Sequence, residues 1–262
     1  MTAFGSYLAC PFRFYLGRVL RMEPIDPSKA EWDAGEFGTF AHEALERVAR
    51  DPRLSRSTDA ALIEEAMLAA LRSRVARRYG SPLPLPLMVQ LESLQQRLRS
   101  WARLEAESRA AGWEIEKVEW SPDPEDGRFA LDGLPISGKI DRIERHRQTG
   151  IVRVLDFKTR DRPDRPEGFH LKKLGARDDP AEYKPYSVFE YNGKSHAWVD
   201  LQLPLYAWLL RTAGETAPIR LGYVNLPKAV SETGVMTWEG FEEAGLLESA
   251  LVCARGVVAD VR

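Results

Sequence analysis

The first half of the chain has the apolar spacing of amphipathic helices. Between residues 37 and 50, apolar side chains recur at the i, i+3, i+4 and i+7 positions that share one helix face. These side chains are Phe37, Phe40, Ala41, Ala44, Leu45 and Val48. Residues 58–79 and 88–111 are also charged and amphipathic, and each segment predicts a helix. The connector between them, GSPLPLPL, is rich in proline, which predicts a stiff and non-helical link.

From residue 113 onward, the pattern changes to short segments with the alternation typical of strands. The strand-like segments are WEIEKVEW (113–120), RFALDG (128–133), LPISGKIDRIERH (134–146), GIVRVLDFKT (150–159) and IRLGYVNL (219–226). Residues 161–197 are polar and rich in proline and glycine, so we expect a long loop with short elements. Residues 200–212 predict a helix that Gly214 closes, and a last helix is expected from 239 to about 259.

The order of these elements predicts an α/β fold around one sheet, with helices first, then a meander of strands, then a helix, a strand and a helix. A chain of 262 residues is long enough for one large domain of this kind and for a substantial core. We expect residues 1–262 to form a single domain, with residues 51–111 as a helical insertion or cap.

The segment VRVLDFK, residues 152–158, places charged groups where an apolar strand ends. Because side chains alternate along a strand, one face of this segment carries Val152, Val154, Asp156 and Lys158. The two valines indicate that this face points toward the core. Asp156 and Lys158 are therefore expected where the core meets an edge, and a carboxylate is unusual there.

The preceding strand brings a second carboxylate, Asp141, toward the first. If residues 147–150 form a hairpin loop, Ile143 lies opposite Val154 and Asp141 lies opposite Asp156. Directly opposed residues have Cβ atoms roughly 4.5–5.5 Å apart. Two carboxylates at that separation repel each other, and a hard divalent ion such as Mg²⁺ between them relieves the repulsion.

The same residues have an ordinary alternative interpretation. Asp156 and Lys158 can form an ion pair at the rim of the core, and Asp141 can pair with Arg142 or Arg145. A slip of one residue in the strand register would also turn Asp141 to the other face. In the metal-site interpretation, by contrast, Lys158 holds a water or offsets the charge of a phosphoryl oxygen.

Two of the predicted helices carry polar groups that can face this edge. His42 lies just outside the apolar stripe of the first helix, one turn after Gly38, so it has room to reach a bound ion. An ordinary histidine at the boundary of the core is the alternative. On the helix 200–212, Gln202 and Tyr206 share a face at i and i+4 and can bind a phosphate or a base. The alternative places Tyr206 in the core and Gln202 at the surface.

Charge is nearly balanced overall but uneven along the chain. The formal net charge is −2, so the molecule as a whole does not indicate a polyanionic partner. Residues 158–177, however, hold seven Lys/Arg against three Asp/Glu. The candidate contacts for a DNA backbone are Arg13, in an N-terminal stretch without acidic residues, and Arg160, Lys172 and Lys173. Solvated basic faces are the alternative.

Cysteine content and apolar runs limit the classes of protein that remain. Cys10 and Cys253 are the only cysteines, which excludes a disulfide framework and a four-cysteine metal site within this chain. This usage suits a reducing, cytoplasmic compartment. The segment YLAC lacks the preceding basic residues and the long apolar run of a signal peptide, and no stretch is long enough to span a membrane.

Taken in order, four motifs resemble those of the PD-(D/E)xK nuclease superfamily, in its RecB-like exonuclease branch. They are GTFAH (38–42), GKIDRIE (138–144), LDFKT (155–159) and LQLPLYAWLL (201–210). The opening FGSYLACPFRFYLGRVL (4–20) is similar to the start of the nuclease domain of AddB/RecB-type helicase–nucleases and of related CRISPR-associated nucleases. The resemblance runs from about residue 4 to about residue 226, and it rests on the shared order of short motifs.

The resemblance implies a restriction-endonuclease-like fold, which is a central mixed β-sheet flanked by helices, here with the added helical segment. By matching positions, it implies that the metal ligands are His42, Asp141, Asp156 and the main-chain carbonyl of Phe157. Lys158 matches the catalytic lysine of the defining motif. Gln202 and Tyr206 match the QxxxY motif of the branch, which is associated with the substrate and with the organisation of the active site.

The activity implied is hydrolysis of DNA phosphodiester bonds with Mg²⁺, for which Mn²⁺ can substitute. The resemblance also implies an exonuclease in DNA repair or recombination, acting on a single strand or an end, with a helicase subunit or domain as partner. Several relatives hold an iron–sulfur cluster with four cysteines, and only Cys10 matches one of these. Because such a cluster needs about four thiolates, we expect none in this chain.

Two other functions are compatible with parts of the pattern. A catalytically silent DNA-binding or scaffold subunit of a repair complex would keep the fold, but here every metal-ligand position of the family is filled. A Mg²⁺-dependent hydrolase of nucleotides would need neither the basic residues 158–177 nor the aromatic N-terminal segment.

Overall fold

The computed structural model describes residue 12 and residues 31–123, 125–175, 177–179 and 183–261. Arg13 and Cys10, for which the sequence makes predictions, lie outside the described residues. Among the described helices, none combines the length and the hydropathy needed to cross a membrane.

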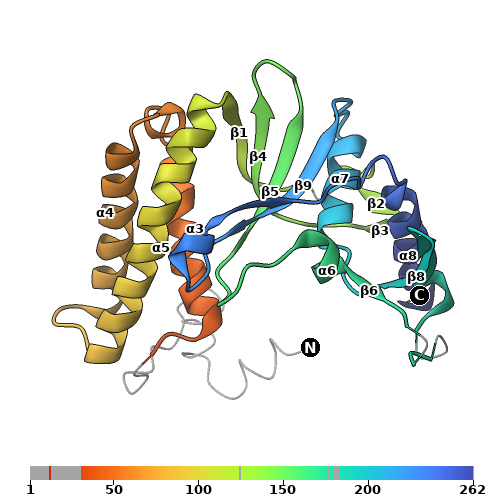
Figure 1. Ribbon diagram of the computed structural model, residues 1–262, viewed down its shortest axis with the longest axis horizontal. Coiled ribbons are helices and arrows are strands. Elements are labelled where there is room, and N and C mark those ends of the chain that lie inside the picture. The colour runs from red at the N-terminus through yellow and green to blue at the C-terminus, as the bar shows by residue number, and fades with distance from the viewer. Residues whose placement is uncertain (1–11, 13–30, 124, 176, 180–182, 262) are drawn as a thin grey trace.

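Three long helices form a layer on one side of the molecule (Figure 1). They are α3 (Ala34–Arg50), α4 (Ala60–Tyr79) and α5 (Leu85–Ala110). Asp33 and Glu36 form a capping box at the start of α3, and Asp59 accepts hydrogen bonds from the first turn of α4. The three predicted helices are confirmed. α5 starts at Leu85, inside the proline-rich connector, because Pro86 is compatible with the first turn of a helix.

A five-stranded mixed sheet lies beside this layer, with the strand order β1-β4-β5-β9-β10. The strands are β1 (Trp113–Trp120), β4 (Ile140–His146), β5 (Val152–Lys158), β9 (Ile219–Asn225) and β10 (Gly234–Thr237). β5 and β9 are parallel, and the other neighbouring strands are antiparallel. The predicted central mixed sheet flanked by helices is therefore confirmed, with β10 as a strand that the prediction missed.

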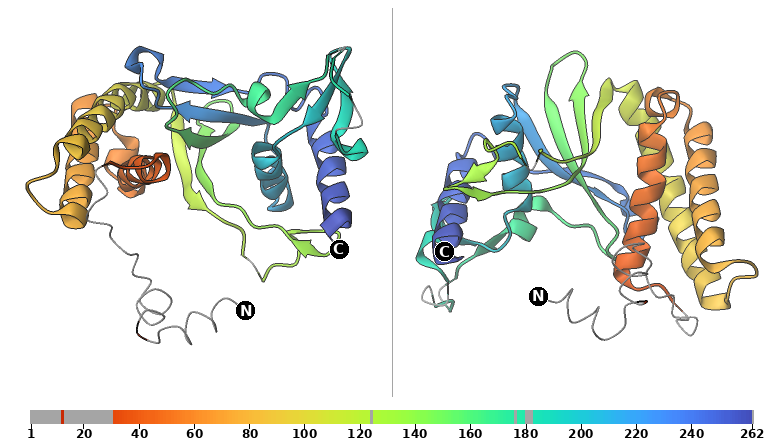
Figure 2. Two further views of the ribbon diagram at one scale, coloured as in Figure 1. Left: turned by 90° about the horizontal axis from the view of Figure 1, so that it is seen from below. Right: turned by 180° about the vertical axis from the view of Figure 1, so that it is seen from behind.

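The two faces of the sheet pack against different helices (Figures 1 and 2). The side chains that face α3, α4 and α5 include Leu155, Phe157, Val224 and Leu226. Those on the opposite face include Ile143, Val154, Leu221 and Tyr223, which pack with α7 (Gln202–Thr212) and α8 (Leu246–Val261). β5 is thus buried on both faces, which explains its nearly continuous apolar run up to Asp156.

α5 lies directly on the sheet. Trp101 and Leu98 share one core with Leu155, and the guanidinium of Arg97 donates to the carbonyl of Thr159 just after β5. These contacts tie the helical layer to the strand that carries the candidate site. The assignment of residues 51–111 as an insertion or cap stays a prediction about domain organisation.

Residues 161–197 contain more structure than the predicted long loop. A short helix, α6 (Pro166–His170), precedes a three-stranded antiparallel sheet of order β6-β8-β7. Its strands are β6 (Leu171–Lys173), β7 (Val188–Tyr191) and β8 (Lys194–Trp198). Strands this short give too few positions for a visible period of two, so only their presence as short elements was predictable.

Two other predicted elements differ in length from those in the structure. The strand-like segments around residue 130 form only a tight hairpin of β2 (Ala130–Leu131) and β3 (Leu134–Pro135). The last helix begins at Leu246 instead of residue 239, because Gly240 and Gly245 adopt positive φ angles of 71° and 65° in the preceding turns. The remaining described elements are 3₁₀ turns at Leu54–Arg56, Pro185–Ser187 and Val230–Glu232.

α8 packs against the ring of Tyr186 at Gly256. A Cβ atom at position 256 would overlap Cγ of Tyr186, whose hydroxyl donates to Asp260 at 2.7 Å. Gly256→Ala must therefore displace this ring, and we expect a loss of about 1–3 kcal/mol in the free energy of unfolding despite the better helix propensity of alanine. Urea denaturation of the variant and of wild type measures this loss. Gly168→Ala, at a helical glycine with nothing within 4 Å, is the control and should stay within about 0.5 kcal/mol of wild type. Equal losses in the two variants would contradict this packing.

Candidate active site

The β4–β5 hairpin has the register that the sequence predicted. The main-chain N–H of His146 donates to the carbonyl of Ile151 at 2.8 Å, across the loop of residues 147–150. Ile143 is paired with Val154. The hydrophobic pattern sets this register, because a slip of one residue would turn the buried valines of β5 to the opposite face.

At the open end of this hairpin, a side chain of β4 takes the place of its backbone as the hydrogen-bond partner of β5. The N–H of Phe157 donates to Oδ2 of Asp141 at 2.8 Å, which ties the β4 carboxylate to β5. Asp141 and Asp156 are each only 5% exposed. Burial and then the charge of Asp141 raise the pKa of Asp156, against the opposing effect of Lys158. Two nearly buried carboxylates from adjacent strands therefore meet at one edge of the sheet.

Of the ion pairs in the alternative interpretation, the structure contains the one between Asp156 and Lys158 but not those of Asp141 with Arg142 or Arg145. Nζ of Lys158 lies 2.8 Å from Oδ2 of Asp156. Arg142 and Arg145, the alternative partners of Asp141, bind other acids. These are Glu105 for Arg142, at 2.6 Å, and Glu116 and Glu215 for Arg145. The nearest ionisable partner that the structure gives Asp141 is His42.

His42 reaches this edge from α3. Its Nε2 lies 3.2 Å from the carbonyl oxygen of Phe157, and its Nδ1 lies 3.6 Å from Oδ1 of Asp141. A carbonyl oxygen only accepts, so the first contact puts the proton of a neutral ring on Nε2 and turns the Nδ1 lone pair toward Asp141. In the protonated ring Nδ1–H can also donate to Asp141. Burial opposes the charged ring, but this hydrogen bond and the charges of Asp141 and Asp156 outweigh it and raise the pKa of His42.

Glu119, on β1, is a further acid at this edge that the sequence prediction missed. The ligand atoms of His42, Glu119 and Asp141 all lie within 4.8 Å of one another. Glu119 has a φ of 52°, and it follows an irregularity in the β1–β4 pairing just after Ile115. WEIEKVEW contains a signal for this: Ile115 and Val118 are three positions apart, which breaks the strand period of two.

Gln202 and Tyr206 form a hydrogen-bonded chain from α7 to the carboxylates. Nε2 of Gln202 donates to Oδ1 of Asp156 and to the hydroxyl of Tyr206, both at 3.0 Å. That hydroxyl donates to the carbonyl of Lys139 at 2.7 Å. Asp200 accepts from the N–H of Gln202 at 2.8 Å and fixes the start of α7. Tyr206 is buried, as the alternative interpretation held, but both side chains are engaged at the site.

Lys158 is held between a carboxylate and two aromatic rings. Besides its contact with Asp156, its Nζ lies 5.0 Å from the ring centre of Phe169 and 4.7 Å from that of Tyr223. Ring faces attract an ammonium group, so these contacts restrict where the amine can move. The buried His170 supports this wall through a hydrogen bond of 2.8 Å with the hydroxyl of Tyr223.

The donor set at this edge fits a divalent cation. An imidazole nitrogen and two carboxylates converge from three elements, α3, β1 and β4. Carboxylate oxygens suit Mg²⁺ and Mn²⁺, and imidazole is a common ligand of divalent transition-metal ions. Lys139, whose ammonium pairs with Glu119, has a side chain that is 62% exposed, so it can move aside without disturbing the core.

Two hollows open at the start of α3, and both are lined by Ala34 and Gly35. The first, which we call the Lys158 hollow, has a volume of about 840 Å³ and lies between α3, α5 and the loops that follow β5 and β9. The second, the Glu119 hollow, has a volume of about 480 Å³ and is lined by His42, Glu119 and Lys139. The candidate site is therefore accessible from solvent on two sides.

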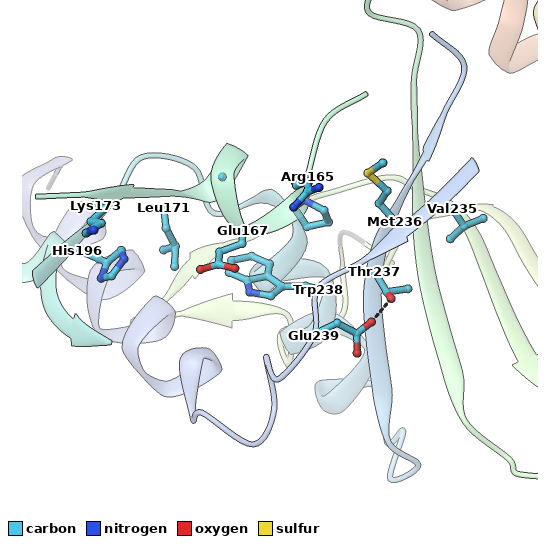
Figure 3. Close-up of a pocket in the computed structure, with 12 residues that line it drawn as sticks. Arg165, Glu167, Leu171, Lys173, His196, Val235, Met236, Thr237, Trp238 and Glu239 are labelled. Atoms are coloured by element: carbon cyan, nitrogen blue, oxygen red, sulfur yellow. Dashed lines mark hydrogen bonds between the residues drawn. The ribbon is translucent and has the colours of Figure 1, made fainter. Parts of the chain in front are cut away.

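The four predicted DNA contacts fall in different places. Arg160 lines the Lys158 hollow and lies 3.3 Å from Asp164. Lys173 lines a separate hollow of about 710 Å³ between α6, β6 and β10 (Figure 3), which contains none of the site residues above. Lys172 pairs with Asp178 at 2.9 Å, and Arg13 lies outside the described residues. Among those that the structure describes, only Arg160 is at the candidate site.

Comparison with known proteins assigns this arrangement to a family. A family model described as the PD-(D/E)XK nuclease superfamily matches residues 1–252. No curated protein matches the chain. The family match covers every site residue described above, from His42 to Tyr206, and the narrower resemblance to the RecB-like branch stays a prediction.

Proposed function

The chain belongs to the PD-(D/E)XK nuclease superfamily, and from this premise we propose that it is a metal-dependent deoxyribonuclease of the RecB-like branch. In this proposal it acts as an exonuclease in DNA repair or recombination. One observation carries the proposal: His42, Asp141, Asp156 and Lys158 meet at a single edge of the sheet. Phosphodiester hydrolysis needs positive charge at the scissile phosphate and a positioned water, and this edge has the side chains for both.

The proposed metal ligands are His42, Asp141, Asp156 and the main-chain carbonyl of Phe157, which lies beside His42. Glu119 is proposed as an additional ligand. A bound Mg²⁺ or Mn²⁺ would polarise the scissile phosphate and lower the pKa of a bound water. The oxygens of Asp156 face Gln202 and Lys158, so these two groups orient the carboxylate.

Lys158 supplies positive charge from the protein itself. Its ammonium is fixed by Asp156 and by the faces of Phe169 and Tyr223, and it borders the Lys158 hollow. From there it can donate hydrogen bonds to the attacking water and to a non-bridging phosphate oxygen. The negative charge that develops on these oxygens in the transition state is then stabilised.

The proposed substrate is a DNA strand, single-stranded or at an end, and a helicase subunit or domain would supply it. Arg160 is at the right place to contact the backbone close to the reacting phosphate. Lys172, Lys173 and Arg13 are proposed as contacts further along the strand. Binding through such groups is electrostatic and should weaken as the salt concentration rises.

Gln202→Leu tests the positioning part of this proposal. Leucine removes the donor to Asp156 while keeping a similar volume, so the carboxylate loses one of its two fixed contacts. We expect DNA cleavage to fall about 10- to 100-fold, the range found when groups that orient metal ligands are removed. Gln96→Leu, at an exposed glutamine of α5, is the matched control and should cleave like wild type. Unchanged cleavage by Gln202→Leu would show that Gln202 does not orient Asp156.

The exonuclease proposal is tested with linear and circular single-stranded DNA, incubated with Mg²⁺, with Mn²⁺ or with EDTA. An exonuclease degrades only the linear form, and only with a divalent ion. Equal degradation of the circle would show an endonuclease. Salt-sensitive binding of DNA without cleavage under any of these conditions would favour the scaffold function.

A further inference from the structure

The Lys158 hollow lies at the carboxyl ends of the parallel strands β5 and β9. The loops that follow these strands are joined there: the N–H of Leu226 donates to the carbonyl of Lys158 at 2.8 Å, and that of Lys228 to Asp161 at 3.2 Å. In open α/β sheets, the crevice outside the carboxyl ends of parallel strands is a preferred place for ligands. The hollow is thus placed like a binding site, and it reaches the proposed catalytic lysine.

A buried cation lines this hollow without a carboxylate partner. Arg97 is only 5% exposed, and its Nη1 donates to the carbonyls of Thr159 and Leu226 at 2.8 and 3.0 Å. Its Nε has no hydrogen-bond partner, and the nearby charge of Asp161 attracts the guanidinium without forming an ion pair with it. The guanidinium instead lies 4.7 Å from the ring centre of Phe37. A buried charge of this kind is unfavourable unless an anion comes close.

The rim of the hollow adds positive charge. Lys158, Arg160 and Lys228 lie on it, opposed by Asp33 and Asp161. The Glu119 hollow has the opposite character, since its acids are Glu43, Glu46 and Glu119 and its basic residues among those described are Lys139 and His42. A polyanionic strand is therefore favoured on the Lys158 side of α3, and the acidic side suits entry of a cation.

The hollow also offers apolar surface beside this charge. Val89, on α5, is 62% exposed, and Phe37 on α3 is half-buried. A nucleotide needs such a combination, because its phosphate is anionic and its base buries a flat, largely apolar face. The hollow in Figure 3 also has apolar side chains, such as Val235 and Met236, but there Arg165 and Lys173 are balanced by Glu167 and Glu239.

We propose that the Lys158 hollow is a nucleotide subsite that takes one unpaired nucleotide of the strand next to the scissile phosphate. Its phosphate would lie near Arg97 and Lys228, and its base would lie against Val89 and Phe37. A base can lie against Val89 and Phe37 only after it has left its stack and its partner, so the subsite selects single strands and frayed ends. This inference rests on the proposed nuclease function and adds the chemical class of the ligand.

Two pairs of variants test the subsite. Val89→Asp puts a negative charge on its wall, and Val252→Asp puts one at an exposed valine of α8, at the other end of the molecule (Figure 1). Lys228→Gln removes a positive charge from its rim, and Arg255→Gln removes one from α8. All four positions are exposed, so the fold should be kept, which thermal melting checks.

The probe is a fluorescein-labelled oligothymidylate, and its binding is followed by anisotropy in EDTA so that no cleavage occurs. We expect Val89→Asp to weaken binding about tenfold, by like-charge repulsion. We expect Lys228→Gln to weaken it about fivefold and to reduce the slope of log K against log salt by about 0.7. The two α8 variants should bind within about twofold of wild type.

The results separate the subsite from the proposed function. If wild type binds and cleaves while Val89→Asp and Lys228→Gln behave like their controls, the subsite is wrong and the nuclease function stands. If wild type binds without cleaving and the two variants weaken binding, the subsite stands and the nuclease function fails. Thymidine monophosphate should displace the probe at concentrations where inorganic phosphate does not. Equal displacement by both would overturn a nucleotide subsite, because the hollow would then recognise only phosphate.

Discussion

Lys158→Met is expected to lower the rate of DNA cleavage about 100- to 1000-fold, the size of effect seen when one preorganised donor to a developing negative charge is removed. Methionine keeps most of the side-chain volume beside Phe169 and Tyr223, so the wall of the site should stay intact. Asp156 loses its cation partner but keeps the hydrogen bond from Gln202. Binding of Mn²⁺, measured by calorimetry, should therefore remain.

The control for this substitution is Lys194→Met, at an exposed lysine of β8. It should cleave DNA like wild type, since it changes the same charge far from Asp156. A Lys158→Met variant that keeps more than about half of the wild-type rate would contradict the role given to the amine. Loss of Mn²⁺ binding together with cleavage would instead make Lys158 a structural support of the site.

Glu144→Gln is expected to lower the free energy of unfolding by about 3–5 kcal/mol, the range for breaking a buried ion pair by removing one partner. Glu144 is fully buried on the sheet face that α5 covers. The charged groups of this buried cluster are Glu105, Arg109, Arg142, Glu144 and Arg153. Two carboxylates there already face three guanidinium groups, so glutamine would leave three cations around the single charge of Glu105.

Chemical denaturation of Glu144→Gln and Glu116→Gln side by side checks this expectation. Glu116 also binds an arginine, Arg145, but both side chains are about one-third exposed. An exposed pair contributes about 0–1 kcal/mol, so Glu116→Gln should be nearly neutral. A similar small loss in both variants would contradict the view that the buried cluster holds β4 against α5.

The buried cluster also sets how the fold responds to acid. Burial favours the neutral carboxyls, but the neighbouring guanidinium charges outweigh it and lower the pKa of Glu105, and that of Glu144 to about 2. An unfolded glutamate has a pKa near 4.5. The carboxylates therefore stabilise the native state above about pH 4.5, and this contribution is lost as the pH falls toward 2. In Glu144→Gln, the free energy of unfolding should fall less steeply across this range.

The register of the β4–β5 hairpin was predictable because two constraints act on it together. The valines of β5 must face the core, and the loop of residues 147–150 is short enough to fix the pairing. Once Ile143 is opposite Val154, the two carboxylates must reach the same edge. The shared helix face of Gln202 and Tyr206 was also predictable, because residues four positions apart are neighbours on the surface of a helix.

What the sequence did not predict depends on irregular backbone or on contacts between distant segments. Glu119 turns toward the site only because β1 has a bulge and a positive φ, and a regular strand pattern does not contain that information. Arg97 looks like one more charge on an amphipathic helix, and its burial becomes visible only when α5 is placed on the loops after β5 and β9. The strands between residues 171 and 198 are too short to show a period.

The most direct test of the proposed metal-dependent site is cleavage of end-labelled linear DNA by wild type and by Asp156→Asn, with Mg²⁺ or with EDTA. The two proteins are first shown to have the same melting temperature, so that a loss of fold cannot explain a loss of activity. We predict cleavage by wild type only with Mg²⁺, and none above background by Asp156→Asn. Cleavage that survives the substitution, or that continues in EDTA, would contradict it.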